Sequence, residues 1–97
     1  MVLKFEWDEK KNAANIKKHR ISFEEAAMVF SDPLRYETYD KIHSLIEKRW
    51  RTVGLAGLKM IRIIFTERKD KIRIITAKKA DKNDEEEYYY GYGTENN

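Results

Sequence analysis

The fold is decided by two neighbouring stretches of the chain, Met60-Ile61-Arg62-Ile63-Ile64-Phe65-Thr66 and Ile72-Arg73-Ile74-Ile75-Thr76-Ala77. Both are rich in β-branched residues, so each predicts a strand, and the polar residues 67–71 between them have the length of a hairpin loop. A third stretch, Arg49-Trp50-Arg51-Thr52-Val53-Gly54-Leu55, ends close before the first of the two. These strands predict an antiparallel meander, to which the alternating residues 34–39 add a fourth strand.

The residues before the strands have helical patterns. Asp8 is a suitable N-cap for a first helix over about residues 9–19, and residues 5–8 before it form a short strand or an extended lead-in. Ser22-Phe23-Glu24-Glu25 matches the capping box and predicts a second, short helix. Helix formers at the front of residues 82–90 predict a short terminal helix.

Two helices followed by four strands predict an α+β domain. We expect both N-terminal helices to pack on one face of a four-stranded antiparallel sheet, leaving the other face partly exposed, with a short C-terminal helix after it. A chain of 97 residues supports one hydrophobic core, so we expect one domain over residues 1–90 and a flexible tail over residues 91–97. Arg62 and Arg73 each point away from their apolar neighbours, and whether they share a face depends on the strand register.

The charge is unevenly distributed along the chain. Residues 1–80 carry 19 Lys and Arg against 11 Asp and Glu, whereas residues 81–97 carry one Lys against six acids. A basic body attracts phosphate-rich partners, although a lysine-rich surface on an ordinary soluble domain explains the same composition. The opposite charge of the last segment motivates the hypothesis that it lies back over the basic face and masks it.

Several classes of protein are excluded by composition. The chain has no cysteine and only two histidines, so we expect neither a disulfide nor a metal site, and no cofactor. No apolar run approaches the ~20 residues of a membrane span, and no secretory signal is recognisable. We therefore expect a cytoplasmic protein without membrane contact.

The motifs taken together resemble the BrnT family of ribonuclease toxins, over roughly residues 5–90. The first half of the resemblance consists of Phe5-Glu6-Trp7-Asp8, Lys10, Asn15, Lys18-His19, Ser22-Phe23-Glu24-Glu25-Ala26 and Val29-Phe30-Ser31-Asp32-Pro33. The second half consists of Glu47-Lys48-Arg49, Gly54, Thr66-Glu67-Arg68 and Ile72-Arg73-Ile74-Ile75-Thr76-Ala77-Lys78-Lys79-Ala80. Several motifs in the right order at the right spacing make this a specific signal.

The resemblance implies a RelE-like fold and a metal-independent endoribonuclease that inhibits translation by cutting RNA without needing the ribosome. It also implies neutralisation by a cognate antitoxin with a ribbon-helix-helix DNA-binding domain, the complex of the two binding operator DNA. Two positions depart from the family pattern. Lys78 stands where the family has Arg, and Asp84-Glu85 stands where an acid is followed by Arg, which favours a weakened enzyme.

Cutting RNA without a metal requires proton transfer and stabilisation of negative charge on a phosphate. We expect four catalytic candidates to supply this chemistry: Arg73, His19, Lys78 and Tyr88. We expect five further residues to bind RNA: Lys18, Arg49, Arg51, Arg62 and Lys79. For Arg73 a structural salt bridge is the competing interpretation, and for Tyr88 it is packing of the terminal helix. His19 could equally be an ordinary helix-ending residue and Lys78 a solvated one.

Three classes of function stay open at this stage. The first is the ribonuclease. The second is a catalytically weakened or inactive module that binds nucleic acid or its antitoxin and acts as a corepressor. The third is a pure interaction protein without affinity for nucleic acid.

Overall fold

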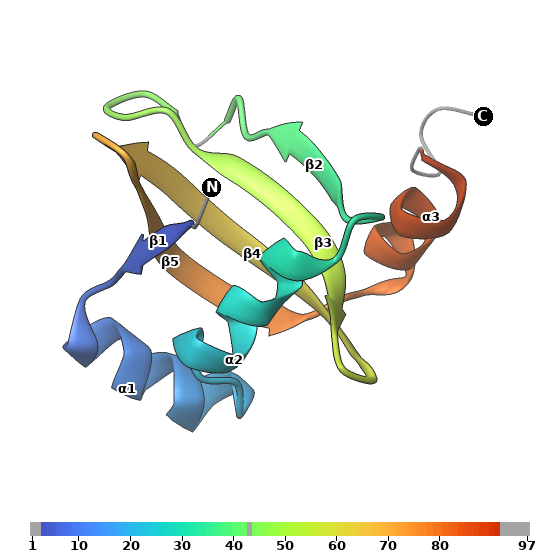
Figure 1. The fold of residues 1–97 in the computed structure, drawn as a ribbon, viewed down its shortest axis with the longest axis horizontal. Coiled ribbons are helices and arrows are strands. Elements are labelled where there is room, and N and C mark those ends of the chain that lie inside the picture. Colours follow the sequence, from blue (N-terminus) through green and yellow to red (C-terminus); the bar gives the residue numbers. More distant parts are fainter. Residues whose placement is uncertain (1–2, 43, 92–97) are drawn as a thin grey trace.

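The computed structural model describes residues 3–42 and 44–91, and they form a curved sheet with helices over one face, beside one edge and at one end (Figure 1). The five strands are β1 (Lys4–Glu6), β2 (Tyr36–Tyr39), β3 (Trp50–Ala56), β4 (Lys59–Arg68) and β5 (Lys71–Lys79). The helices are α1 (Glu9–His19), α2 (Phe23–Ala27), the 3-10 helix η1 (Met28–Ser31) and α3 (Lys82–Tyr90). No helix in this part of the chain is both long and apolar enough to cross a membrane.

The sheet differs from the expected four-stranded antiparallel one. Its order is β1-β5-β4-β3-β2, and β1 pairs with β5 in parallel, placing Phe5 opposite Ile72, so the sheet is mixed and has five strands. The sequence left residues 5–8 as a short strand or a lead-in and did not place them in the sheet, because three extended residues contain no information about a partner more than sixty residues away. The other three pairings are antiparallel, as expected.

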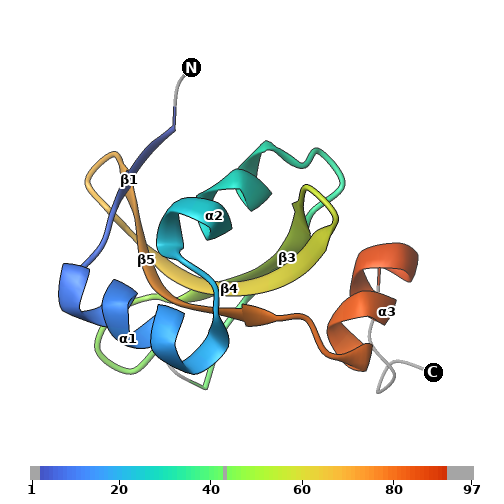
Figure 2. The ribbon, with the colours of Figure 1, turned by 90° about the horizontal axis from the view of Figure 1, so that it is seen from below.

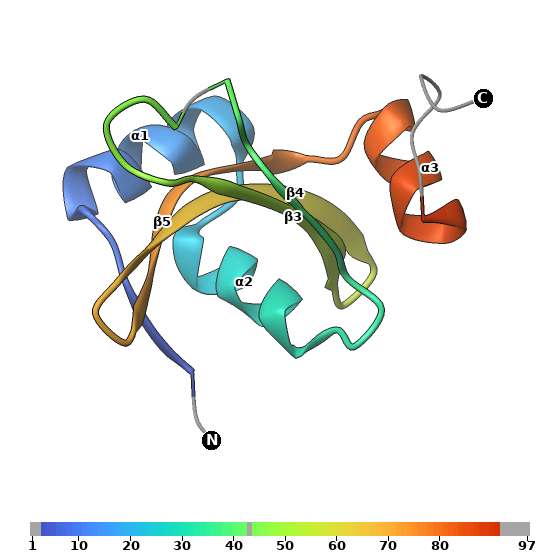
Figure 3. The ribbon, with the colours of Figure 1, turned by 90° about the horizontal axis from the view of Figure 1, so that it is seen from above.

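The arrangement of the first two helices also corrects the prediction. Helix α2 and η1 cover one face of the sheet, whereas α1 lies along the outer edge of β5, outside that face (Figures 2 and 3). Asn15 explains this position, because its amide donates to the carbonyl oxygen of Ala77 at 2.8 Å and its Oδ1 accepts from the Ala77 N–H at 3.2 Å. The side chain thus continues, beyond β1, the hydrogen bonding that a neighbouring strand would give to β5.

The core lies between α2 and the inner face of the sheet. Every second residue of β4 faces it, namely Ile61, Ile63 and Phe65, and Phe23 of α2 packs against them with no exposed surface. Ser22 caps α2 as expected, with its hydroxyl accepting the Glu25 N–H at 3.0 Å. Burial of these side chains is the main stabilising contribution, at about 25 cal/mol per Å² of apolar surface.

The register resolves the question of Arg62 and Arg73. Arg62 lies opposite Lys78 and Arg73 lies opposite Thr66, so both arginines are on the face that α2 leaves open. A bulge interrupts the pairing after Ile64, whose partner is Thr76 while Phe65 pairs with Ile74. The sheet therefore presents an outer surface on which the cations of β3, β4 and β5 lie in neighbouring rows. Of the predicted flexible tail, residues 92–97 lie outside the described part of the chain.

Candidate functional site

The open face of the sheet contains a hollow with a volume of about 590 Å³. The end of β2 and the residues after it form one wall, and β3, β4 and β5 form the floor. Its lining is Thr38, Tyr39, Asp40, Lys41, Ile42, Arg49, Arg51, Arg62, Ile64, Ile75, Thr76 and Lys78. Four of the cations predicted as site residues, Arg49, Arg51, Arg62 and Lys78, are therefore brought together here.

Strand alternation places these cations on one surface. Arg51, Ile64 and Thr76 form one cross-strand row, and Arg62 lies opposite Lys78 in another. Directly opposite residues in an antiparallel pair have Cβ atoms about 4.5–5.5 Å apart, so like charges there repel unless a counter-charge is near. The floor of the hollow is thus a site of concentrated positive charge.

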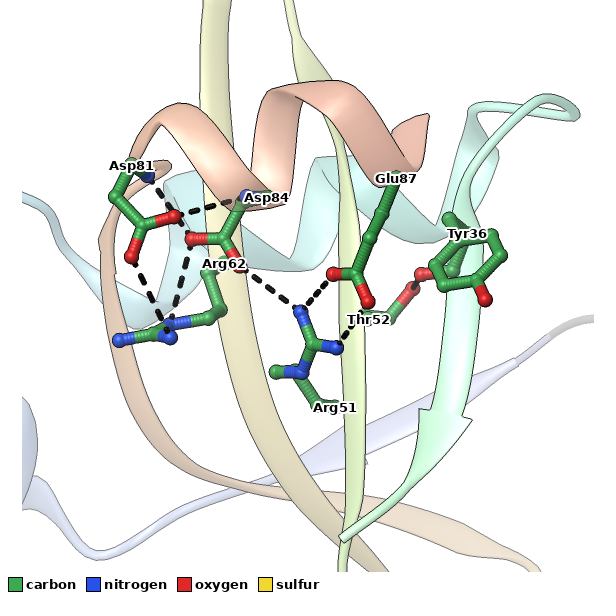
Figure 4. A network of polar contacts seen from close by, with 7 residues as sticks. All are labelled: Tyr36, Arg51, Thr52, Arg62, Asp81, Asp84 and Glu87. Carbon is green, nitrogen blue, oxygen red and sulfur yellow. Dashed lines mark hydrogen bonds and ion pairs between the residues drawn. The ribbon is translucent and has the colours of Figure 1, made fainter. Parts of the chain in front are cut away.

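Two carboxylates of α3 supply part of that counter-charge (Figure 4). Nη1 of Arg51 is 2.9 Å from Oδ1 of Asp84, and both terminal nitrogens of Arg51 donate to Glu87, Nη2 at 2.8 Å. The side chain of Asp84 is 1% exposed and that of Glu87 is 5% exposed, so the pair is shielded from water. The hydrogen bond to Glu87 raises the pKa of Arg51, and burial raises the pKa of Asp84.

Arg62 is held more loosely by the same helix. Its Nε lies 3.6 Å from Oδ2 of Asp84, and its Nη1 lies 3.9 Å from Oδ2 of Asp81. Asp81 also caps α3, and hydrogen bonds from the backbone N–H of Asp84 are the main reason that the pKa of Asp81 is lowered. The acidic segment therefore does lie on part of the basic face, through Asp84 and Glu87.

Lys78 and Arg49 differ from these two arginines. Within residues 3–42 and 44–91, Lys78 forms no ion pair, although its charge is one of the smaller causes that lower the pKa of Asp81. Arg49 has one long contact, 3.9 Å from its Nη2 to Oε1 of Glu47, and its buried Nε has no hydrogen-bond partner. An unsatisfied buried donor costs about 1–3 kcal/mol, and because this nitrogen is buried, a ligand has to contact the exposed part of the Arg49 side chain, which is 32% exposed.

Comparison with known proteins identifies the family of this chain. The family model described as "Ribonuclease toxin, BrnT, of type II toxin-antitoxin system" matches residues 7–84. The chain belongs to the BrnT family of toxins. Among solved structures, it is similar to the Brucella abortus ribonuclease toxin BrnT, determined at 1.1 Å resolution, with a TM-score of 0.61 and 24% sequence identity. That match covers 84% of this chain and all of the Brucella chain, and it shows a shared fold. No curated protein matches.

Three other candidate residues of this BrnT-family chain border two smaller hollows beside α1. Lys18 and His19 line one of about 260 Å³, together with Lys11, Ala14, Asn15, Ile75 and Thr76. His19 also lines a second of about 300 Å³, which includes Lys79. Lys18, His19 and Lys79 thus lie outside the large hollow, but the first of these two hollows adjoins it at Ile75 and Thr76.

Arg73, the first catalytic candidate, does not line the hollow. Its Nη1 is 3.2 Å from Oε2 of Glu6, the residue opposite it on β1. That contact is the structural salt bridge that the sequence left as the alternative, and both side chains are a little over a quarter exposed. An ion pair at this exposure contributes at most about 1 kcal/mol to stability.

Tyr88, the fourth catalytic candidate, does not line the large hollow and is hydrogen-bonded to Asp32, the residue after η1. Its hydroxyl donates to Oδ2 of Asp32 at 2.7 Å, and Oδ2 also accepts from the Leu55 N–H. Burial raises the pKa of Asp32, but these hydrogen bonds and one from the Leu34 N–H outweigh it, so the net pKa is lowered. Burial and the bond to Asp32 raise the pKa of Tyr88 to about 12.

This bond predicts a pH effect on stability. Because the folded pKa of Tyr88 is raised from 10.0 to about 12, its contribution is complete below pH 10 and is lost as the pH rises towards 12. We expect Tyr88→Phe to be less stable than the wild type by about 1–2 kcal/mol at neutral pH, and the difference to shrink above pH 10. Urea unfolding of both proteins across this range measures it. A difference that stays constant with pH would contradict the assignment.

Sequence reasoning missed two contributors to this region. The pairing of Asp84 and Glu87 with Arg51 was not expected, although carboxylates three positions apart on a helix share one side, which is a recognisable signal for a common partner. Lys41, which was not among the predicted site residues, also lines the hollow. Within the described ranges, no group of three or more His, Cys, Asp or Glu is arranged to hold a metal ion.

Proposed function

We propose that the protein is a metal-independent endoribonuclease whose substrate RNA binds in the hollow on the open face of the sheet. The observation that carries this proposal is that one concave surface holds two cations without a close carboxylate: among the described residues Lys78 forms no ion pair, and Arg49, whose side chain is 32% exposed, has only the 3.9 Å contact to Glu47. Membership of a family of ribonuclease toxins supports the same chemistry. Phosphate oxygens are the acceptors that such cations bind best.

The proposed reaction uses the RNA's own 2′-hydroxyl as nucleophile. Its oxygen attacks the adjacent phosphorus while its proton passes to a base, and the bond from phosphorus to the 5′-oxygen breaks as that oxygen receives a proton. The products are a 2′,3′-cyclic phosphate and a free 5′-hydroxyl. Negative charge develops on the phosphate oxygens between these steps, so cations placed beside them lower the barrier.

The lining residues suggest a division of roles. Lys78 and Arg49 bind and stabilise the phosphate. Asp40 also lines the hollow, and its carboxylate is the first candidate for the base that accepts the proton of the 2′-hydroxyl. His19 is the second candidate for proton transfer, and it lines the adjoining hollow on the other side of Thr76. Arg51 and Arg62 already have carboxylate partners, so we assign them to shaping the floor and to the general positive field.

The biological setting follows from the family. We propose that RNA cleavage inhibits translation in the cytoplasm, and that a cognate antitoxin with a ribbon-helix-helix DNA-binding domain neutralises the protein and carries it to operator DNA. Growth arrest on expression, relieved by coexpression of the neighbouring reading frame, is the expected result. Expression without growth arrest would remove the toxin role.

A second candidate function has an observation of its own. The carboxylates of α3 occupy Arg51 and Arg62, which reduces the positive charge available to RNA and favours a weakened enzyme or a binding module. Incubating the purified protein with RNA in excess chelator distinguishes the ribonuclease from the binding module. Shortened RNA with cyclic phosphate ends supports the enzyme, whereas salt-sensitive binding without product supports the binding module.

We expect Lys78→Met to reduce the rate of RNA cleavage by about a hundredfold, because removing one group that stabilises developing charge typically has that effect. Thermal stability should be unchanged, since Lys78 makes no ion pair within the described part of the chain. Lys71→Met is the matched control, because Lys71 is exposed at the other end of β5 and does not line the hollow. Equal rates for the two variants would place the reaction elsewhere.

A further inference from the structure

The large hollow does not end at β5. Ile75 and Thr76 of this strand line the hollow of about 590 Å³ on one side and the hollow of about 260 Å³ beside α1 on the other. Thr76 is exposed and short, and Ala14, on the α1 side, is exposed and smaller still. The two hollows are therefore adjoining parts of one surface, divided by a low ridge at Thr76.

The side chains beyond the ridge are suited to phosphate. Lys11, Lys18 and His19 line the α1 hollow. Within residues 3–42 and 44–91 neither lysine has a carboxylate within ion-pair distance, unlike Arg51, which Asp84 and Glu87 hold. Lys11 does act on the nearby Asp8, whose pKa its charge helps to lower, but neither lysine is held in an ion pair with a described residue, so both can bind an anion.

The basic end of α1 carries more charge than the helix itself requires. The last turn contains Lys17, Lys18 and His19. A helix C-terminus has the equivalent of about half a negative charge, which a single cation more than offsets. The remaining positive charge can attract a phosphate, and Lys18 is the lysine of this turn that lines the hollow.

We propose that the α1 hollow is a second phosphate subsite, which binds the RNA strand flanking the one in the large hollow. The ligand is single-stranded RNA of several nucleotides that crosses β5 at Thr76, with Lys18 and Lys11 binding its phosphates and His19 facing a base or sugar. This inference rests on the proposed ribonuclease function and extends it to the length of strand that the protein recognises. It predicts that affinity increases once a strand is long enough to reach α1.

The experiment measures binding of 2′-O-methyl RNA, which lacks the nucleophile for cleavage, by fluorescence anisotropy. Oligonucleotides of about three and about ten nucleotides are compared, since sites for single strands span several nucleotides. The variant Lys11→Gln/Lys18→Gln removes the proposed subsite. The matched control is Lys10→Gln/Lys17→Gln, which removes the same charge from two exposed lysines of α1 that do not line the hollow.

We expect the Lys11/Lys18 variant to bind the longer strand roughly tenfold more weakly, with the short strand little affected and the control close to wild type. For this variant the slope of log affinity against log salt concentration should be smaller in magnitude by about 1.4, since each of the two lost single-strand phosphate contacts contributes about 0.7 to the slope. If wild type binds both strands and the two double variants behave alike, the subsite is wrong while the ribonuclease proposal stands. If wild type binds neither strand and cleaves no RNA, both are overturned.

Discussion

Asn15→Leu should lower the free energy of unfolding by about 3–4 kcal/mol, the largest effect that we expect from one substitution in this protein. The Asn15 side chain makes three buried hydrogen bonds, donating to the carbonyls of Ile21 and Ala77 and accepting from the Ala77 N–H. Leucine fills a similar volume but leaves these backbone groups without partners, and each unsatisfied buried group costs about 1–3 kcal/mol. The estimate assumes partial relief by water entering from the adjoining hollow.

Urea unfolding with extrapolation to water measures this change. Leucine has a better helix propensity than asparagine, so a loss of stability cannot be attributed to the helix itself. Lys17→Leu is the control, because Lys17 is exposed on the same helix, and it should change stability by about 0.5 kcal/mol or less. A loss below about 1 kcal/mol for Asn15→Leu would show that α1 is not anchored to β5 through this side chain.

Arg51→Met should cost about 3 kcal/mol. It leaves the carboxylate of Glu87 buried without its guanidinium partner and Asp84 with only Arg62 at 3.6 Å, and breaking a buried pair from one side typically costs 3–5 kcal/mol. The lower end applies because the Arg51 side chain is 20% exposed. Urea unfolding at constant salt gives the value.

Two further measurements test the cause of the Arg51 effect. The double variant Arg51→Met/Glu87→Leu removes one of the stranded charges and should be more stable than Arg51→Met alone. Burial already raises the pKa of Asp84, and loss of the Arg51 cation raises it further, so the contribution of its protonation is present at low pH and is lost as pH rises. Arg51→Met should therefore approach wild-type stability in mild acid. If neither the Glu87→Leu substitution nor mild acid reduces the stability loss of Arg51→Met, the loss is due to the packing of the Arg51 side chain instead.

Much of the fold followed from local patterns. The first helix begins and ends within the expected residues because Asp8 caps it, accepting the N–H groups of Lys10 and Lys11. The three long strands were recognised from their β-branched residues. For β1 the sequence left a strand and a lead-in open and missed the parallel pairing with β5, because that pairing depends on how α1 turns the chain, which no short-range pattern encodes. For the same reason the edge position of α1 was missed.

The candidate site was predictable to the extent that it depends on alternation. The strand pattern had separated Arg62 from its apolar neighbours, whereas Lys78 shares the open face with it because the bulge after Ile64 shifts the register, which strict alternation does not predict. The partners of Arg51 and Arg73 were not predictable, because Glu87 and Glu6 reach them from elements distant in sequence. Tertiary contacts, not residue type, thus determine which cations remain available to a ligand.

The covering of β5 has a consequence for how this protein can associate with other chains. Along β5, β1 occupies the edge at residues 71–73 and Asn15 binds Ala77. The opposite edge of the sheet is β2, which has only four residues. Alternate residues of an edge strand direct their N–H and C=O groups outwards, so β2 offers a very short template. Intermolecular strand addition, the usual first step of sheet-driven aggregation, is therefore disfavoured on both sides.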